Sequence, residues 1–123
     1  MFSEYKSSGK HMICDIKGIQ NIDLLNNIDE LSGILKQICK ENDFQILNEI
    51  QYKFDPIGCS ILFLLSESHL SIHTFPEKNH MSFDIYTCRQ YEDNKIYDNI
   101  FSYLVNSLKA SVESRQKVLD RYF

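Results

Sequence analysis

The chain has 123 residues, of which 43% are hydrophobic and 12% aromatic. This length fits one domain, and the apolar content supports a packed core, which excludes wholesale disorder. The 13 Lys and Arg residues against 17 Asp and Glu residues give a net charge of −4, without a basic cluster. Nucleic acids and anionic membranes are therefore poor candidates as partners.

Signals for membrane insertion and secretion are weak. The longest apolar run covers residues 61–65, far short of the roughly 18 residues that a membrane-spanning helix needs. Residues 1–6 are too polar for a signal peptide. The four cysteines are widely spaced and form no C-x-x-C pair: Cys14, Cys39, Cys59 and Cys88. We therefore expect reduced thiols in a cytoplasmic protein.

The N-terminal half is predicted to form a strand, a helix and a second strand. Residues 11–16 indicate the first strand, and Asn21 or Asp23 is a suitable N-cap for a helix. Apolar residues at spacings of three and four mark the buried face of that helix: Leu24, Ile28, Leu31, Leu35 and Ile38. Apolar residues at alternate positions then predict a strand over residues 44–54 with one half-buried face: Phe44, Ile46, Ile50, Tyr52 and Phe54.

The remaining segments complete an α+β pattern. A turn at residues 55–58 separates the previous strand from an apolar strand through Leu65, and residues 68–75 and 81–88 form two more strands. Residues 97–108 have the spacing of a second amphipathic helix, and residues 110–122 are predicted to be an edge strand. The order predicts one domain over residues 1–123, a two-layer sandwich of an antiparallel sheet with two helices on one face. We expect a second copy of the chain to cover the other face, so that the sheets pack together in a dimer.

Reactive side chains gather in residues 66–77. Alternation places His69, Ser71, His73 and Phe75 on one face of a strand. A zinc site from His69, His73 and Glu77 is disfavoured, because four residues of strand separate the two histidines by about 13 Å; no metal is predicted. A serine hydrolase is disfavoured because no G-x-S-x-G motif surrounds the serines. An amphipathic strand with solvent-facing polar residues remains an alternative from the residues alone.

One run of eleven residues resembles the processing site of prokaryotic-type S-adenosylmethionine decarboxylases: Glu67-Ser68-His69-Leu70-Ser71-Ile72-His73-Thr74-Phe75-Pro76-Glu77. Residues 9–15, 54–60 and 83–88 resemble three further blocks of that family in the same order. Three positions depart from the pattern. Phe75 stands where Trp or Tyr is commoner, Tyr52 where many members have His, and Ile61 where many have Gly. The last two bear on the shape of the substrate pocket.

The resemblance implies a proenzyme that cuts itself between Glu67 and Ser68 into residues 1–67 and 68–123. Ser68 would become a covalent pyruvoyl cofactor. Decarboxylation of an amino acid leaves a carbanion that needs an electron sink, which no side chain provides. A pyruvoyl carbonyl joined to the substrate amine as a Schiff base would provide one. The implied substrate is S-adenosylmethionine, and the product is the aminopropyl donor for spermidine synthesis.

The same resemblance implies roles for five other residues. His73 corresponds to the processing base, Ser60 to a hydroxyl that steadies the cleavage intermediate, and Cys88 to the proton donor for the substrate carbon. Phe54 corresponds to a residue that stacks on adenine and Glu77 to one that binds the ribose hydroxyls. Each site is expected to lie between two protomers of a homodimer. A paralogue acting on ornithine or arginine, or an uncleaved regulatory homologue, remains an alternative.

Overall fold

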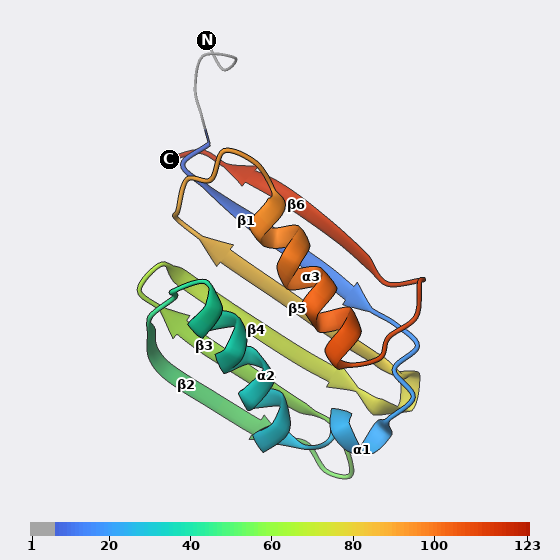
Figure 1. The fold of residues 1–123 in the computed structure, drawn as a ribbon. Helices are drawn as coiled ribbons and strands as arrows, with labels where there is room; N and C mark the ends of the chain where they lie inside the picture. The colour runs from blue at the N-terminus through green and yellow to red at the C-terminus, as the bar shows by residue number, and fades with distance from the viewer. Residues whose placement is uncertain (1–6) are drawn as a thin grey trace.

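The computed structural model describes residues 7–123 (Figure 1). Residues 1–6, on which the expectation about a signal peptide depends, lie outside this range. Along the described chain the elements are β1 (Gly9–Ile16), α1 (Ile22–Leu25), α2 (Ile28–Glu41), β2 (Ile46–Lys53), β3 (Cys59–Leu65), β4 (Ser68–Phe75), η2 (Pro76–Lys78), β5 (His80–Thr87), α3 (Lys95–Ser107) and β6 (Arg115–Arg121).

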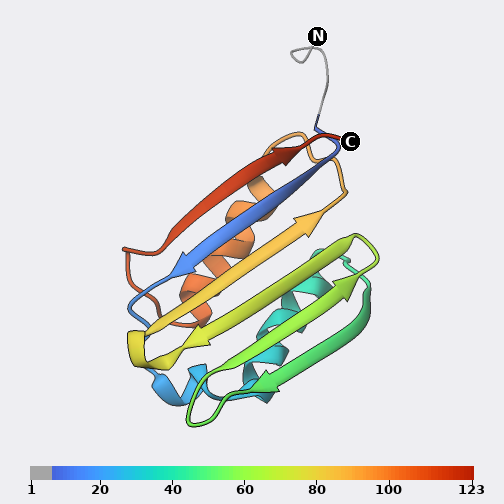
Figure 2. The same cartoon turned by 180° about the vertical axis from the view of Figure 1, so that it is seen from behind.

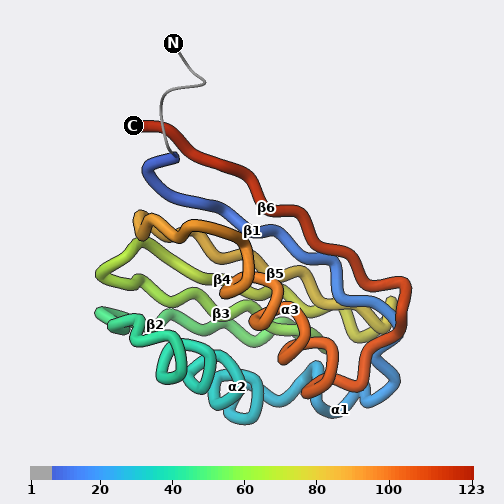
Figure 3. Tube along the Cα trace, turned by 45° about the horizontal axis from the view of Figure 1, so that its top comes forward, coloured from blue at the N-terminus to red at the C-terminus, as the bar shows by residue number. Residues whose placement is uncertain are grey.

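The strands form one six-stranded sheet in the order β2-β3-β4-β5-β1-β6, and every neighbouring pair is antiparallel. β1 lies between β5 and β6, so the first strand of the chain is enclosed by two later ones (Figure 2). The long helices α2 and α3 lie side by side on one face of the sheet (Figures 1 and 3). The α+β sandwich, the two covering helices and the edge position of the last strand are confirmed.

The core fills the space between the helices and the sheet. Its largest fully buried side chains come from all layers: Tyr97, Phe63, Met12, Ile16, Ile19, Leu25, Leu31, Leu35, Ile38, Ile61, Leu70 and Ile72. Three free cysteines are buried with them, and Cys88 is exposed. Over residues 7–123, no helix combines the length and the apolar character that a membrane crossing requires.

The single helix expected after the first strand is wrong, because the chain breaks into α1 and α2. Asn21 caps α1 by accepting the Leu24 N–H at 3.1 Å, and Asn27 caps α2 by accepting the Glu30 N–H at 3.1 Å. An asparagine side chain that satisfies free N–H groups starts a new helix at little cost. The apolar spacing runs across this break, which conceals it in the sequence.

The half-buried face expected for residues 44–54 is also wrong in the isolated chain. β2 is an edge strand, and Ile50 and Tyr52 are 64% and 63% exposed. The helix-facing side of β2 instead carries Glu49, whose carboxylate accepts a hydrogen bond from Ser32 of α2 at 2.8 Å. Ile50 and Tyr52 therefore extend the uncovered face of the sheet, next to Leu62 and Ser60 of β3; Figure 2 shows β2 at the edge of this face.

Candidate active site

The tight turn between β3 and β4 contains the predicted cleavage bond. Ser68 opens β4 with a φ of +148°, a conformation that L-residues rarely adopt. Residues held in such backbone regions cost about 1–3 kcal/mol and gather at functional sites. Ser66 fixes the other side of the turn, because its N–H donates to the carbonyl oxygen of Gln45 at 2.9 Å. The peptide bond between Glu67 and Ser68 is therefore held in place and adjoins a strained residue, Ser68.

The carbonyl oxygen of that peptide bond accepts a hydrogen bond from the backbone of another strand end. The N–H of Cys88 donates to the Glu67 carbonyl oxygen at 2.9 Å. Cys88 takes this place because Thr87, the residue before it, pairs with Ser68 across β4 and β5. Thr87 is itself fixed from the core by a 2.9 Å hydrogen bond to the Tyr97 hydroxyl. A donor on a carbonyl oxygen stabilises the negative charge that develops when the carbon is attacked.

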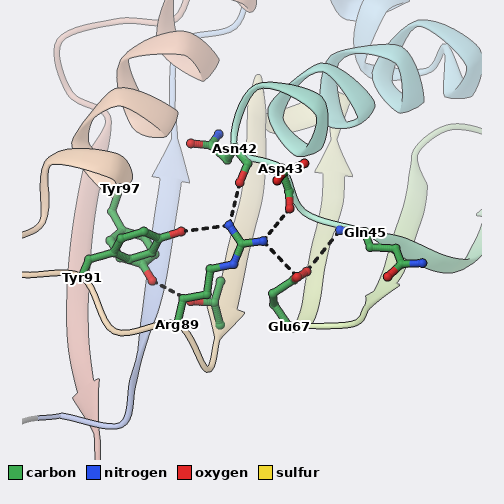
Figure 4. A network of polar contacts seen from close by, with 8 residues as sticks. Asn42, Asp43, Gln45, Glu67, Arg89, Tyr91 and Tyr97 are labelled. Carbon is green, nitrogen blue, oxygen red and sulfur yellow. Dashed lines mark hydrogen bonds and ion pairs between the residues drawn. The ribbon is translucent and has the colours of Figure 1, made fainter.

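The Glu67 side chain is held as firmly as its backbone (Figure 4). One carboxylate oxygen accepts the Gln45 N–H at 3.2 Å, and the other pairs with the Arg89 guanidinium at 3.0 Å. Burial opposes ionisation here, but hydrogen bonds from Ser66, Arg89 and Gln45 outweigh it and lower the pKa of Glu67. Arg89 continues the network to the carbonyl of Asn42 at 2.7 Å.

A second group of predicted residues lines a cavity of about 330 Å³ at the other end of β3 and β4: Phe54, Ile57, Ser60, His73, Thr74, Phe75 and Glu77. Ser60 and His73 face each other across the strands, and Ser60 Oγ lies 2.7 Å from His73 Nδ1. The structure thus brings together four residues that sequence analysis singled out one by one. An imidazole, a hydroxyl, a carboxylate and an aromatic ring in one cavity suit both proton transfer and substrate binding.

The two groups are far apart within one chain. Ser68 and His73 are the first and sixth residues of the same strand. At about 3.3 Å per residue, their Cα atoms are roughly 16 Å apart. His73 therefore cannot reach the Ser68 of its own chain, and the chain carries two separate half-sites, the Ser68 turn and the His73 cavity.

Of the two departures from the family pattern near the substrate pocket, only one lies beside the cavity. Tyr52 pairs with Ser60 across β2 and β3, and its ring centroid is 4.9 Å from that of Phe54. Ile61 is fully buried in the core. The expectation that Ile61 shapes the pocket is wrong, because adjacent residues of a strand point to opposite faces.

The middle of the uncovered face carries a polar cluster around Asp84. Its carboxylate accepts hydrogen bonds from His11 at 2.6 Å, from His69 at 3.2 Å and from Ser71. Burial raises the pKa of Asp84, but these three hydrogen bonds outweigh it and lower the pKa. The ligand atoms of the histidines and the aspartate lie within 4.8 Å of one another. The strand alternation predicted the face of His69, but not its partners.

Sequence analysis also missed Arg89 and Gln45. Their contacts with Glu67 span 22 residues each, so no local pattern connects them to the cleavage bond. The one available signal was position, because Arg89 directly follows Cys88 at the end of a matched block.

Comparisons with known proteins agree on one family. The model of the family described as S-adenosylmethionine decarboxylase matches residues 10–121. An S-adenosylmethionine decarboxylase proenzyme 2 from Bacillus cereus is 38% identical, over 94% of this chain and 91% of the relative. An S-adenosylmethionine decarboxylase proenzyme from Brevibacillus brevis is 36% identical, over 94% of this chain and 84% of the relative. The crystal structure of the adenosylmethionine decarboxylase from Aquifex aeolicus superposes with a TM-score of 0.83 at 26% identity, covering 97% of this chain and 94% of that one. The chain therefore belongs to the S-adenosylmethionine decarboxylase family.

Proposed function

We propose that this chain is a self-processing proenzyme that becomes a pyruvoyl-dependent S-adenosylmethionine decarboxylase after cleavage between Glu67 and Ser68. The observation that carries the proposal is the geometry of that bond. Ser68 has a strained φ of +148°, and the Cys88 N–H donates to the adjoining carbonyl at 2.9 Å. The names of the relatives favour S-adenosylmethionine as substrate over ornithine or arginine, and their proenzyme names favour a cleaved product over an uncleaved regulator.

Cleavage begins when Ser68 Oγ attacks the Glu67 carbonyl carbon. The C–N bond breaks, the hydroxyl proton passes to the amide nitrogen, and an ester replaces the peptide bond. The Cys88 N–H stabilises the negative charge on the carbonyl oxygen during this step. Breaking the peptide bond also releases the strain at Ser68. Both the Cys88 N–H and the strained backbone at Ser68 therefore favour the rearrangement of the peptide bond to an ester.

The second step needs a base. Removal of the Ser68 α-proton breaks the Cβ–O bond and releases the Glu67 carboxylate, leaving dehydroalanine at residue 68. Hydrolysis then gives the pyruvoyl group and ammonia. We assign the base to His73, because its imidazole is hydrogen-bonded to Ser60 and an imidazole can accept a proton at neutral pH. Ser60 would orient that imidazole.

The residues around Ser68 suit a pyruvoyl group. The position is half-buried at the head of a strand, and an sp² carbon removes the chiral centre that is strained there. When present, the group supplies the carbonyl that accepts the electrons released with CO₂. Cys88 is exposed and its backbone contacts Glu67, next to this position, so its thiol would donate the proton to the substrate carbon. Phe54 and Glu77 would bind the adenine and the ribose hydroxyls.

A complete site then requires two protomers, because Ser68 and His73 of one chain are roughly 16 Å apart. We propose a homodimer in which the uncovered sheet faces pack together and the His73 cavity of one chain meets the Ser68 turn of its partner. Exposed apolar side chains on this face support the packing: Ile13, Ile50, Leu62, Leu64 and Leu119. A two-fold axis makes two identical sites from the four half-sites.

Mixing two inactive variants tests this proposal. Ser68→Ala lacks the nucleophile, and His73→Ala lacks the base, so neither is cleaved when it is expressed alone. In a mixed dimer, one site combines the intact Ser68 of the His73→Ala chain with the intact His73 of the Ser68→Ala chain. We expect intact mass spectrometry of differently tagged chains to show cleavage of the His73→Ala chain alone.

Two controls accompany the mixing experiment. The wild-type chain should give residues 1–67 and 68–123, the second lighter by one ammonia than its serine form. Purification through the tag of the uncleaved partner confirms that mixed dimers form. Mixed dimers without any cleavage, alongside a normally cleaved wild type, would contradict the shared site. A wild-type chain that is not cut between Glu67 and Ser68 would contradict the proenzyme proposal itself.

A further inference from the structure

Arg89 connects the cleavage turn to the loop after α2. Its guanidinium pairs with the Glu67 carboxylate at 3.0 Å and donates to the carbonyl of Asn42 at 2.7 Å and to that of Asp43 (Figure 4). The same group lies 4.7 Å from the centroid of the Phe44 ring. Four acceptors, of which the Tyr91 hydroxyl at 3.4 Å is the fourth, and an aromatic face fix its plane, which a lysine ammonium could not reproduce.

The Glu67 carboxylate has little freedom in this arrangement. Only 16% of its side chain is exposed, and each of its oxygens has a donor. One donor, the Gln45 N–H, belongs to residues 42–45, and the other, Arg89, is bound to the carbonyls of that loop. The carboxylate therefore holds the acyl side of the cleavage bond against the loop. On the amine side, Ser68 enters β4 and is fixed by the ladders to β3 and β5. The peptide bond between Glu67 and Ser68 therefore joins two segments that are anchored independently.

We propose that Arg89 is a positioning residue for maturation: it clamps Glu67 to residues 42–45 and so holds the carbonyl toward the Cys88 N–H and within reach of Ser68 Oγ. This inference rests on the proposed cleavage between Glu67 and Ser68. Without the clamp, the turn relaxes toward an unstrained φ at Ser68, and the alignment of nucleophile and carbonyl is lost. Alignment of this kind accounts for a large part of the rate in reactions within one molecule.

The clamp has a further role once the bond is cut. Glu67 becomes the C-terminus of residues 1–67, whereas Arg89 belongs to residues 68–123. The ion pair then joins two separate chains and keeps the new terminus, with its second carboxylate, docked on residues 42–45. In a purely structural role, Arg89 would only bind the carbonyls of Asn42 and Asp43 that follow α2, since arginine often binds carbonyls at helix C-termini. The two roles predict different results when Glu67 is replaced, because only the positioning role requires the Glu67 side chain.

The test is a double-mutant cycle on the cleavage rate, followed by intact mass in freshly synthesised chains. Arg89→Ala should slow cleavage by roughly tenfold or more, the usual effect of losing a hydrogen bond to a charged group. Arg89→Lys should recover part of that loss. Because Arg89 acts through the Glu67 side chain, adding Arg89→Ala to Glu67→Ala, which removes both acceptor oxygens, should slow cleavage by less than about twofold. Hydroxylamine, which cuts the ester, reports whether the first step is the one slowed.

Arg115 offers a matched control. Its guanidinium also donates to loop carbonyls, those of Val112 at 3.1 Å and Ser114 at 3.0 Å, and it does so at the start of β6. We expect Arg115→Ala to cleave within about twofold of the wild-type rate, as surface changes away from the site usually do. Thermal unfolding of each variant combined with Ser68→Ala, which keeps the chain whole, reports folding separately.

The outcomes are distinct. A folded Arg89→Ala chain that cleaves at the wild-type rate overturns the inference while the proposed function stands. An effect of Arg89→Ala that is just as large in the Glu67→Ala background also overturns it, because the arginine would then act only through the carbonyls that follow α2. A wild-type chain that is not cut between Glu67 and Ser68 overturns the proposed function, and the inference with it.

Discussion

Replacing Gly9 with alanine perturbs the cleavage bond without touching any reacting group. Gly9 opens β1 directly against the end of β5. A Cβ at this position would lie 2.2 Å from the Thr87 carbonyl oxygen and 3.0 Å from the Cys88 Cα, whereas ordinary contact begins at 3.4 Å. The backbones must therefore separate by about 1.2 Å, the difference between the two oxygen contact distances. Such overpacking commonly costs about 1–3 kcal/mol.

This displacement reaches the cleavage bond through Cys88. Its N–H donates to the Glu67 carbonyl at 2.9 Å, and because β5 lies between β1 and β4, a shift of about 1 Å away from β1 pushes this pair out of hydrogen-bonding geometry. Loss of one such hydrogen bond removes about 1–2 kcal/mol of stabilisation, which corresponds to roughly 5- to 30-fold in rate. We expect Gly9→Ala to slow maturation by that factor.

The assay measures the fraction of freshly synthesised chain that is cleaved over time, by intact mass. Gly33→Ala is the matched control, because none of the described residues places an atom within 4 Å of a Cβ at this position in α2. That change should stabilise the helix by about 0.5–1 kcal/mol and leave the cleavage rate unchanged. A Gly9→Ala chain that folds and matures at the wild-type rate would refute the role assigned to the Cys88 N–H.

Three further predictions concern other parts of the molecule. At pH 8, iodoacetamide should modify Cys88 first, because it is exposed, whereas burial raises the pKa of Cys14 to about 12 and that of Cys39 to about 11. Asp84→Asn should reduce the pH dependence of the unfolding free energy, measured by urea titrations from about pH 5 to pH 2. The pKa of Asp84 is lower in the folded chain than in the unfolded chain, so the carboxylate stabilises the fold at pH values above its unfolded-state pKa. This stabilisation is lost as the pH falls through its folded-state pKa. Phe54→Ala should raise KM by roughly 5- to 150-fold with little change in kcat, because stacking of an aromatic ring on a base contributes about 1–3 kcal/mol.

Each of these has a contradicting result. Peptide mapping that finds Cys14 alkylated in the folded protein as fast as Cys88 would contradict the burial argument. An Asp84→Asn chain whose unfolding free energy declines as steeply in acid as that of the wild type would contradict the role of its hydrogen bonds. A Phe54→Ala enzyme with an unchanged KM would remove Phe54 from substrate binding.

The sequence predicted the sheet well, because most strands have one covered face and alternate accordingly. It failed where that assumption failed. Ile50 and Tyr52 alternate in the same way whichever face carries the helices, so the pattern could not show that they point away from them. The break before α2 was missed because the apolar stripe continues past Asn26 and Asn27, whose capping hydrogen bonds end α1 and start α2 only in the folded chain.

Some residues of the candidate site could be predicted from the sequence, and others could not. Similarity to the family pointed to Phe54, Ser60, His73 and Glu77 one by one, and the sheet register then placed them around one cavity. No local pattern could show Arg89, whose carbonyl partners lie 47 and 46 residues away along the chain. Nor could it show that the two half-sites lie at opposite ends of one strand, since that follows from where the turns fall.

The position of β1 between β5 and β6 has a consequence for the proposed mature protein. Cleavage after residue 67 would place β1, β2 and β3 in one chain and β4, β5 and β6 in the other. Three of the five strand pairings, β3 with β4, β5 with β1 and β1 with β6, would then join different polypeptides. The sheet would contain strands from two chains that folded while they were still one. Its unfolding would release two molecules, so refolding would become concentration-dependent, and the linked precursor would be the form that folds as a single chain.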